Sequence, residues 1–448
     1  MKYIGIDIGT TSVCGAVLDT ASRRIVTAVT QQNRSFIRTS NSWERIQDTA
    51  KILAAARRII TGLTAKHSGI AGIGVTGQMH GIVYVDDNGD VVSPLYTWQD
   101  TRAGLPHRYG TYAERFSRIT GYPVAPGFGL ATHFYNLKNN IVPACTVSFC
   151  TIMDYIVMKL TGNRSPKIDA TNAASFGVFD LRKRCFDTKA LAQSGIDTTM
   201  LPDVVPSASI AGHWHGIPVV TALGDNQASF LGSVRNIERT ALVNFGTGAQ
   251  VSAFTEKFAA IDGLDTRPFP GGGYLFVGAS LCGGKSYALL ERFFRKTIAC
   301  FGVQQPPDIY AAMNDIDYDS LTDRLAVDTR FAGTRTDPAR RGGISNMSMD
   351  NLTPEHLIAG FLDGMVNELA DMYRAIPARV RTRVQSLTGS GNGLRKNQLL
   401  KHIVEKRFGY AMRFPAHVEE AAVGAAMAAA VGTGHGDFAT IGKLIRYE

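Results

Sequence analysis

The sequence lacks long apolar runs. None of its 448 residues lies in a stretch of the roughly 18 to 20 apolar residues that a membrane-spanning helix needs. The amino terminus has no secretory leader pattern either, because the first residues already read as a strand. Both absences predict a cytoplasmic protein without a membrane partner. No two of the six cysteines show the CxxC spacing of zinc or redox sites, so free thiols are expected.

Clustered charge is also scarce. Charged residues make up 19% of the chain, and the formal net charge of +9 is spread over short groups such as 182–184 and 340–341. Aromatic residues do not alternate with these groups, as they do on surfaces that stack single-stranded nucleic acid. The pattern argues against a nucleic-acid partner, whereas a mild positive field suits a small anionic substrate such as a nucleotide.

What the chain does contain is an aspartate at a predicted strand-to-helix junction. Residues 221–232, TALGDNQASFLG, bring an apolar segment to Gly224 and Asp225, directly before a run of small residues with helical character. A carboxylate at such a junction points into the crevice where open α/β sheets bind ligands, and it can accept a proton. The alternative is that Asp225 only caps the helix that follows.

The opening residues predict a β-hairpin whose turn suits phosphate. Strands are expected over 2–8, 13–19 and 24–30, with the first two joined by Gly9, Thr10, Thr11 and Ser12. Such a turn offers N–H and hydroxyl donors to phosphate oxygens. Asp7 ends the first strand beside the turn, where a carboxylate makes electrostatic sense if Mg²⁺ lies between it and the phosphate. A plain hairpin without a ligand is the alternative.

The opening pattern recurs in the second half of the chain. Residues 239–254, RTALVNFGTGAQVSAF, repeat the strand, Gly-Thr turn and strand, with Asn244 where the opening has Asp7. Gly246 and Thr247 belong to the second turn. The missing carboxylate is expected if both turns face one phosphate chain and only the first needs a metal. The repeat predicts two related domains.

A dense set of polar and aromatic side chains follows the strand predicted over 70–75. It consists of Gln78, Met79, His80, Trp98, Gln99, Asp100 and Arg102. Planar polar groups that fork to neighbouring hydroxyls, with an aromatic ring over a C–H face, predict a sugar site. Taken singly, His80 has a structural alternative, Trp98 a place in the core, and Asp100 with Arg102 a surface ion pair.

Helices are predicted in several further places. One is expected to start at a capping box of Asn41 and Glu44 and to close at Gly62. Others are an amphipathic helix from Thr353 and Pro354, a helix ending at Gly162, and a small-residue helix over 421–432 that can approach another element closely. A strand over 384–388 precedes the loop 389–392, which can lie flat along a purine ring.

Two nucleotide-binding motifs are matched only in part, and we reject both. Gly72, Gly74 and Gly77 have the dinucleotide spacing, but another strand follows where a helix is required. In GASLCGGKS, residues 278–286, the glycine spacing of a P-loop is absent. Lys285 is therefore expected to be a solvent-exposed residue at the start of a helix.

Six strings occur in the order found in the FGGY carbohydrate kinase family: DIGTTS, TGQMHG, TWQDTR, GDNQASF, FGTG and GSGNGL. The chain resembles this family over essentially its whole length. The resemblance implies an α/β fold of two ribonuclease-H-like domains, of the actin and hexokinase ATPase type, with a cleft between them. Residues 1–235 would bind sugar and carry the catalytic aspartate, and residues 236–448 would bind ATP.

The resemblance also assigns roles to residues by position. Asp225 corresponds to the catalytic base, and Asp7 with Asp225 to the Mg²⁺ site. Sugar contacts correspond to Gln78, Met79, His80, Trp98, Asp100, Arg102 and Asn226. ATP contacts correspond to Thr10, Thr11, Ser12, Gly246, Thr247, Gly389, Gly391, Asn392 and Asn397.

Within the family, GQMHG with WQD resembles xylulokinases and sedoheptulokinases, and the loop GSGNGLRKNQLLK is closer to the sedoheptulokinase pattern. The resemblance thus implies phosphorylation of sedoheptulose to sedoheptulose 7-phosphate, feeding the pentose phosphate pathway. Xylulose, or another ketose or polyol, is the alternative substrate. A catalytically silent sugar sensor is a more distant alternative, and a homodimer is left open.

Overall fold

The computed structural model describes residues 1–302, 308–334, 337 and 339–448. They form two compact units. Unit 1 comprises Met1–Arg235, Arg267–Tyr274 and Glu419–Arg446, and unit 2 comprises Asn236–Thr266, Leu275–Val418 and Tyr447–Glu448. The chain first leaves unit 1 after Arg235. Two later segments, Arg267–Tyr274 and Glu419–Arg446, return to unit 1. Among the described residues, no helix combines the length and apolarity needed to cross a bilayer.

Unit 1 is built on a seven-stranded sheet. Its order is β13-β14-β5-β1-β2-β3, and β15 pairs with β5 off this path. The bounds are β1 Lys2–Ile8, β2 Ser12–Asp19, β3 Arg24–Gln32, β5 Ile70–Gly77, β13 Ile210–Trp214, β14 Ile217–Val220 and β15 Leu223–Gly224. β1 pairs antiparallel with β2 and parallel with β5. The predicted opening hairpin and third strand are confirmed.

Helices cover both faces of this sheet. α1 (Thr49–Lys66) buries Ile59 and Leu63 against Gly15 of β2, whereas α14 (Glu420–Gly432) packs on β1 and β5. Because Gly15 pairs with Ile6, and neighbouring residues of a strand point to opposite faces, Gly5 of β1 faces away from α1 and toward α14. α4 (Ile152–Thr161) also packs on β5, and it ends at Gly162 as predicted.

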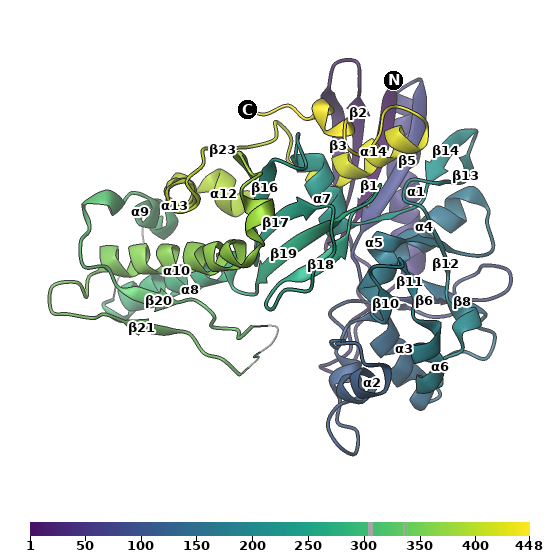
Figure 1. Cartoon of the computed structure of the whole chain (residues 1–448), viewed down its shortest axis with the longest axis horizontal. Coiled ribbons are helices and arrows are strands. Elements are labelled where there is room, and N and C mark those ends of the chain that lie inside the picture. Colours follow the sequence, from purple (N-terminus) through teal and green to yellow (C-terminus); the bar gives the residue numbers. More distant parts are fainter. Residues whose placement is uncertain (303–307, 335–336, 338) are drawn as a thin grey trace. The chain divides into compact units, whose positions relative to one another are not determined.

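Glycines allow α14 to approach the sheet and α7 (Asp225–Ser233) very closely (Figure 1). A Cβ on Gly5 would lie 1.7 Å from the Ala422 carbonyl oxygen, and one on Gly74 would lie 1.9 Å from that of Ala425. On Gly232 it would meet the Glu420 carbonyl oxygen at 1.9 Å. The predicted close approach is therefore confirmed, and the partners are elements of unit 1. The close packing of α14 on α7 fixes the position of the helix that begins with Asp225.

Shorter elements complete unit 1. The two-residue and three-residue strands are β4 Ile46–Gln47 with β7 Leu95–Tyr96, β6 Val83–Val85 with β8 Ser148–Cys150, β9 Lys167–Asp169 with β12 Asp203–Val205, and β10 Phe179–Asp180 with β11 Cys185–Phe186. The remaining α-helices are α2 Tyr112–Thr120, α3 Gly129–Lys138, α5 Ala170–Ala173 and α6 Thr188–Ser194.

The helix predicted from Asn41 and Glu44 is wrong at both ends. α1 begins at Thr49, where the Asp48 side chain caps it by accepting from Lys51 N, and it continues past Gly62 to Lys66. Residues 46–47 form β4 instead. The Glu44 carboxylate binds Arg102 at 3.2 Å, so a distant partner takes the side chain that the local pattern assigned to a cap.

Unit 2 has a six-stranded sheet in the order β18-β19-β17-β16-β22-β23. The strands are β16 Thr240–Phe245, β17 Ala249–Thr255, β18 Asp265–Pro268, β19 Tyr274–Ser280, β22 Ser386–Ser390 and β23 Met412–Arg413, with a separate pair β20 Ala326–Asp328 and β21 Gly343–Ser345. The α-helices are α8 Gly283–Cys300, α9 Ile309–Asn314, α10 Pro354–Ala375, α11 Ala378–Arg381, α12 Asn392–Lys396 and α13 Gln398–Phe408. The predicted amphipathic helix is confirmed as α10, with Thr353 as its N-cap.

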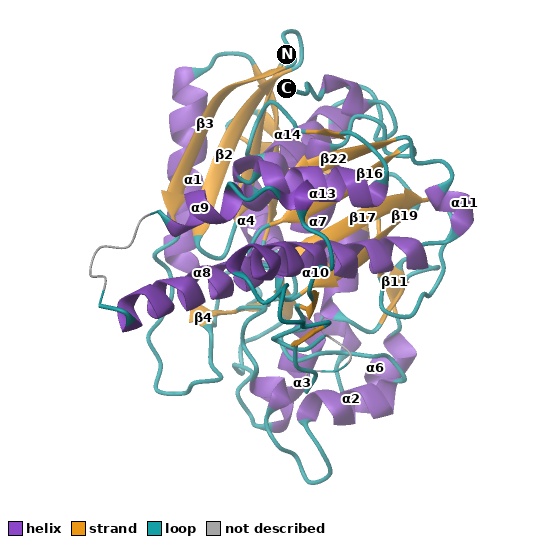
Figure 2. Ribbon diagram, turned by 90° about the vertical axis from the view of Figure 1, so that its left-hand side faces the viewer, coloured by secondary structure: helices purple, strands orange, loops and turns teal. Residues whose placement is uncertain are grey.

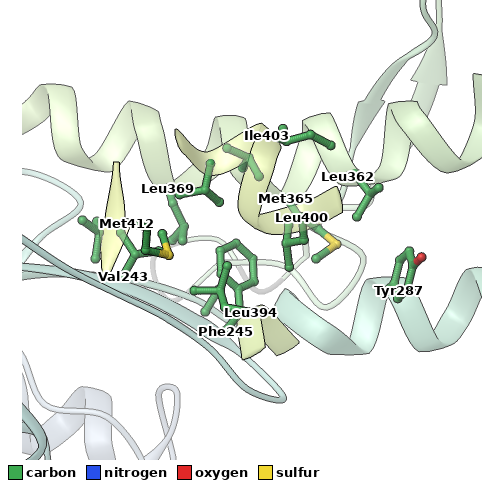
Figure 3. Packing of buried hydrophobic residues seen from close by; sticks show 14 of the residues in the cluster. Val243, Phe245, Tyr287, Leu362, Met365, Leu369, Leu394, Leu400, Ile403 and Met412 are labelled. Carbon is green, nitrogen blue, oxygen red and sulfur yellow. The ribbon is translucent and has the colours of Figure 1, made fainter. Parts of the chain in front are cut away.

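The core of unit 2 lies between its sheet and the helices α8, α10 and α13 (Figure 2). Leu362, Met365 and Leu369 of α10 meet Leu400 of α13 and Phe245 at the end of β16 (Figure 3). Burial of each such side chain contributes roughly 1.5–3 kcal/mol. The core thus fixes the end of β16, from which the second Gly-Thr turn emerges.

The two sheets share one strand pattern. β16 pairs antiparallel with β17 and parallel with β22, just as β1 pairs with β2 and β5. Asn244 in β16 is the next-to-last residue of its strand, as Asp7 is in β1. The structure therefore confirms the internal repeat read from the sequence.

Candidate active site

Asp225 is the first residue of α7, directly after the short strand β15. The N-cap is Gly224, which supplies no side-chain cap, so the capping alternative for Asp225 is wrong. A Cβ on Gly224 would lie 2.7 Å from the Met79 methyl carbon. Glycine at this position therefore lets Met79 pack against the junction that carries the carboxylate.

Buried hydrogen bonds hold the junction in place. The Thr171 hydroxyl accepts from Gly224 N at 2.8 Å, and it donates to Asp169 Oδ1 at 2.5 Å. The Thr76 hydroxyl, on β5, donates to the Leu223 carbonyl oxygen at 2.8 Å. These side chains come from elements far apart in sequence, and together they set the direction in which Asp225 leaves the strand.

Asp7 and Asp225 are electrostatically coupled within unit 1. Burial raises the pKa of Asp7 to about 7, and the negative charge of Asp225 adds to the rise. Burial also raises the pKa of Asp225, while the positive charge of Arg267 and a hydrogen bond from Asn226 N–H oppose that rise. A carboxyl group whose pKa is raised by the charge of another lies near it. The two acids singled out in the sequence are thus brought to one place.

This acid pair fits a divalent cation. A cation between the two carboxylates would relieve their repulsion and offset the cost of burying their charges. Among the residues that the structure describes, no group of three or more His, Cys, Asp or Glu side chains could hold a metal ion. Mg²⁺ suits a site with fewer protein ligands, since one or two carboxylates usually hold it together with phosphate and water.

The first Gly-Thr turn is tied to the predicted sugar residues. The indole N–H of Trp98 donates to Thr10 Oγ1 at 2.9 Å, and that hydroxyl donates to Gln78 Oε1 at 3.4 Å. Trp98 is 46% exposed, so the alternative of a core position is wrong. Its exposed ring beside the turn is available to cover a ligand. The Thr10 hydroxyl proton is directed at Gln78. The backbone N–H of Thr10 is therefore the donor of this residue that remains for a phosphate.

Asp100 and Arg102 form a buried pair, which corrects the alternative of a surface ion pair. They are 0% and 1% exposed. The Arg102 guanidinium donates to both Asp100 oxygens, to Asn136 Oδ1 and to Glu44 Oε1, and it lies 4.2 Å from the centre of the Tyr96 ring. Each nitrogen of the guanidinium donates to a protein partner, so Arg102 holds Glu44, Asp100 and Asn136 together. Their contact with sugar stays a prediction.

His80 is held by the α5 region. Its ring Nδ1 lies 2.7 Å from the Ser175 carbonyl oxygen, its backbone N–H donates to Ser175 Oγ at 3.1 Å, and the ring stacks on Phe128. The backbone of His80 has a positive φ of 72°, which few non-glycine residues adopt. Such strain is concentrated at functional sites.

The second Gly-Thr turn, in unit 2, is packed on the start of α8. The Gly246 carbonyl accepts from Gly284 N at 2.9 Å, and the Thr247 carbonyl accepts from Lys285 N at 3.1 Å. A Cβ on Gly283 would lie 2.4 Å from the Gly248 carbonyl group. GASLCGGKS is therefore not a P-loop, yet its glycines bring a helix onto the turn. The side chain of Lys285 is exposed, as predicted.

The predicted adenosine loop follows β22 in the same unit. Gly391 has a φ of 84°, and a Cβ there would lie 2.5 Å from the Phe245 carbonyl oxygen. Asn244 Nδ2 donates to Ser390 Oγ at 2.7 Å. The loop and the second turn are therefore adjacent. Gly389 is buried and Asn392 is exposed, and Asn397 caps α13 by accepting from Leu400 N at 2.8 Å.

Several residues at these sites carried no local signal in the sequence. Gln47, Asn33, Thr171 and Arg267 contact or face the turn and the acid pair only because the fold brings them there. The glycine pair at the start of α8 did give a signal, since Gly283 and Gly284 stand at a strand-to-helix junction.

Comparison with known families gives two matches that together span most of the chain. The N-terminal domain model of the FGGY family of carbohydrate kinases matches residues 2–232, and the C-terminal domain model of the same family matches residues 241–433. The two matches meet where the chain passes from unit 1 to unit 2.

Individual relatives and solved structures agree with the family. The chain is 30% identical over 469 residues to a sedoheptulokinase from Homo sapiens, covering 95% of this chain and 96% of the relative. It is 26% identical to a glycerol kinase from Alteromonas mediterranea, covering 96% and 90%. A crystal structure titled as a xyloylose kinase from Brucella ovis superposes with a TM-score of 0.86 at 23% identity, covering 100% and 93%. The fold with two ribonuclease-H-like domains is thereby confirmed.

Proposed function

Since the chain belongs to the FGGY family of carbohydrate kinases, and is therefore a sugar phosphotransferase, we propose that it transfers the γ-phosphate of ATP to a ketose, with sedoheptulose as the preferred acceptor. The observation that carries the proposal is the coupled pair Asp7 and Asp225 in unit 1, at the ends of β1 and β15, which both pair with β5. A protein that only binds sugar needs neither acid, and withdrawing both from water costs stability.

In the proposed reaction Asp225 is the general base. The oxygen of the sugar's terminal hydroxyl forms a bond to the γ-phosphorus, the bond from that phosphorus to the bridging oxygen of ADP breaks, and the hydroxyl proton passes to the Asp225 carboxylate. Support comes from its position at the start of α7 and from its fixed backbone. The Arg267 charge and the Asn226 N–H, which oppose the rise in its pKa, favour the ionised form that can accept a proton.

Asp7 and Asp225 are the proposed ligands of Mg²⁺. When bound, Mg²⁺ would neutralise charge on the phosphates as the phosphoryl group moves. The residues of this chain supply the two carboxylates and hold them on the ends of β1 and β15, and the first Gly-Thr turn places Thr10, Thr11 and Ser12 beside Asp7. In unit 2, Gly246, Thr247 and the loop 389–392 are the proposed contacts for the phosphates and the adenosine.

Sedoheptulose is favoured over xylulose by two observations. The alignment with sedoheptulokinase covers nearly the full length of both chains. The loop after β22, GSGNGLRKNQLLK, also follows the sedoheptulokinase pattern. The proposed sugar contacts are Gln78, Met79, His80, Trp98, Asp100, Arg102 and Asn226. The cytoplasmic location and a homodimer stay predictions.

The substrate assignment is tested with purified full-length protein. ADP release is measured in a coupled assay with Mg²⁺ and ATP against sedoheptulose, xylulose, ribulose and glycerol. We expect kcat/KM to be highest for sedoheptulose. A higher value for another acceptor would contradict the choice of sugar, and no activity on any of the four would contradict the proposed reaction.

A further inference from the structure

The carbonyl groups of the first three residues of the first Gly-Thr turn are all hydrogen-bonded within unit 1. Asn33 Nδ2 donates to the Gly9 carbonyl oxygen at 2.9 Å, and Gln47 Nε2 donates to that of Thr10 at 2.9 Å. The Thr11 carbonyl accepts from Asn33 N at 2.8 Å. Two residues, Asn33 and Gln47, therefore hold these three oxygens.

Neither amide is a mobile surface group. Gln47 is 0% exposed and lies in β4, which pairs with β7, and its Oε1 accepts from Gln78 Nε2 at 2.8 Å. Asn33 is 8% exposed and directly follows β3. Each amide is thus fixed by the backbone on which it stands, and it can impose an orientation on the turn.

Fixing these carbonyls also fixes the direction of the neighbouring N–H groups. In a planar trans peptide, the C=O of one residue and the N–H of the next point in opposite directions. When Asn33 and Gln47 hold the Gly9 and Thr10 carbonyls, the N–H groups of Thr10 and Thr11 are turned to the other side. A turn in this state presents donors and hides its partial negative charges, as a phosphate requires.

The second turn shows the same arrangement independently. There the Gly246 and Thr247 carbonyls accept from the backbone N–H groups of Gly284 and Lys285. The corresponding two carbonyls are held in both halves of the repeat, although the donors are side-chain amides in one half and a helix start in the other. The two halves of the repeat thus reach the same carbonyl arrangement with unrelated donors.

We propose that Asn33 and Gln47 are positioning residues for triphosphate binding, because they orient the first Gly-Thr turn so that its N–H groups face the phosphates. The proposal rests on the proposed kinase function and adds to it. It predicts an effect on ligands that carry β- and γ-phosphates, and none on AMP, which lacks them.

The experiment compares Asn33→Leu and Gln47→Met with the wild-type protein. Asn163→Leu is the matched control, since Asn163 Nδ2 donates to the Ala211 carbonyl oxygen at 2.8 Å in the same unit and does not contact the turn. The Kd values of the non-hydrolysable analogue AMP-PNP, with Mg²⁺, and of AMP are measured by calorimetry on full-length protein. Thermal unfolding of each variant is recorded, together with the KM for ATP and for sugar.

We expect each variant to weaken AMP-PNP binding by about three- to tenfold, the effect of one lost hydrogen bond. The Kd of AMP and the KM for sugar should change less than about twofold, and Asn163→Leu should leave the Kd of both nucleotides unchanged. If a variant fails to fold, Gln47→Glu and Asn33→Asp replace it, since both keep the size of the side chain and lose the donor.

Two results would overturn the proposal. One is an equal loss for AMP-PNP and AMP, and the other is an unchanged Kd for AMP-PNP in folded variants. A wild-type protein that binds neither nucleotide would instead overturn the proposed kinase function, so the two failures are distinguishable.

Discussion

The two Gly-Thr hairpins of this chain have the same strands and different surroundings. The first, between β1 and β2, carries Asp7 and is held by the side chains of Asn33 and Gln47. The second, between β16 and β17, carries Asn244 and is held by the backbone of α8. One hairpin therefore lies beside coupled acids, and the other has a neutral amide at the matching position.

This difference shows in which half of the repeat the turn is held in place by side chains. A single substitution can remove an amide donor or a carboxylate from the first hairpin, whereas backbone donors of the second can be displaced only by moving a helix. Substitutions around the first hairpin should change chemistry with little effect on folding. Substitutions around the second should change packing and nucleotide binding together.

The largest effect is expected at the acid next to the first hairpin. Asp225→Asn keeps the size and position of the side chain but cannot accept the proton, so kcat should fall by about 10²- to 10⁴-fold. Calorimetry with sedoheptulose should show a nearly unchanged Kd. Near-normal kcat in this variant would contradict the role of Asp225 as base.

The second-largest effect on kcat is expected from Asp7→Asn, which makes the first hairpin resemble the second. Asp7→Asn reproduces the Asn of β16, and loss of a proposed Mg²⁺ ligand should lower kcat by at least about 10- to 100-fold. The Mg²⁺ concentration for half-maximal rate should rise. An unchanged Mg²⁺ dependence would show that Asp7 does not serve the metal.

The same variant has a predicted pH dependence of stability in metal-free protein. The pKa of Asp7 is raised to about 7, above its value in the unfolded chain, so the native state favours the protonated form. The contribution of Asp7 to wild-type stability is full below the unfolded pKa of about 4 and is lost as the pH rises toward 7. Asp7→Asn lacks this decline, so its Tm relative to wild type should increase between pH 4 and pH 7. A constant difference would contradict the raised pKa of Asp7.

A smaller effect is expected from disturbing the second hairpin. In Gly283→Ala, the new Cβ would meet the Gly248 carbonyl group at 2.4 Å and push α8 away from the turn. The free energy of unfolding should fall by about 1–3 kcal/mol, and the KM for ATP should rise more than the KM for sugar. Gly343→Ala is the control, because a Cβ there has no neighbour within 4 Å. Equal KM changes for both substrates would contradict this assignment.

The smallest effect is expected at Trp98. Trp98→Phe keeps an aromatic face and loses only the N–H that donates to Thr10 Oγ1. Loss of one hydrogen bond, at the lower end of the usual range of hydrogen-bond energies, should raise the KM for ATP by about two- to threefold. A loss in kcat of the size seen for Asp225→Asn would show that the indole does more than hold the turn.

The sequence predicted the parts of the fold that are written in local patterns. β1, β2, α4 and α10 follow from alternation, helical spacing and caps within one segment, and the repeat follows from two similar strings. The start of α1 was predicted wrongly for a long-range reason. Glu44 forms an ion pair with Arg102 instead of the capping box that the local sequence predicts. The placement of α14 in unit 1 depends on its close approach to Gly5 and Gly74. These glycines are far from α14 in the sequence, so no local pattern predicts the contact.

For the site, the sequence singled out the residues that we propose as ligand contacts and missed those that hydrogen-bond to them. Asp7, Asp225 and Gly246 stand at ends of strands, where chain order alone indicates a role. Gln47 and Asn33 act through hydrogen bonds to a turn about 37 and 24 positions away, and such a distance leaves no spacing pattern to read. The burial that raises the pKa of Asp7 likewise requires the whole sheet.

The most direct test of the account is to follow the phosphorus of ATP. Wild-type protein is incubated with ATP, Mg²⁺ and sedoheptulose, and the products are recorded by ³¹P NMR. We predict ADP and a sugar phosphate monoester in equal amounts, with neither formed at a comparable rate by Asp225→Asn. ADP with inorganic phosphate and no sugar ester, or no conversion of ATP, would contradict the account.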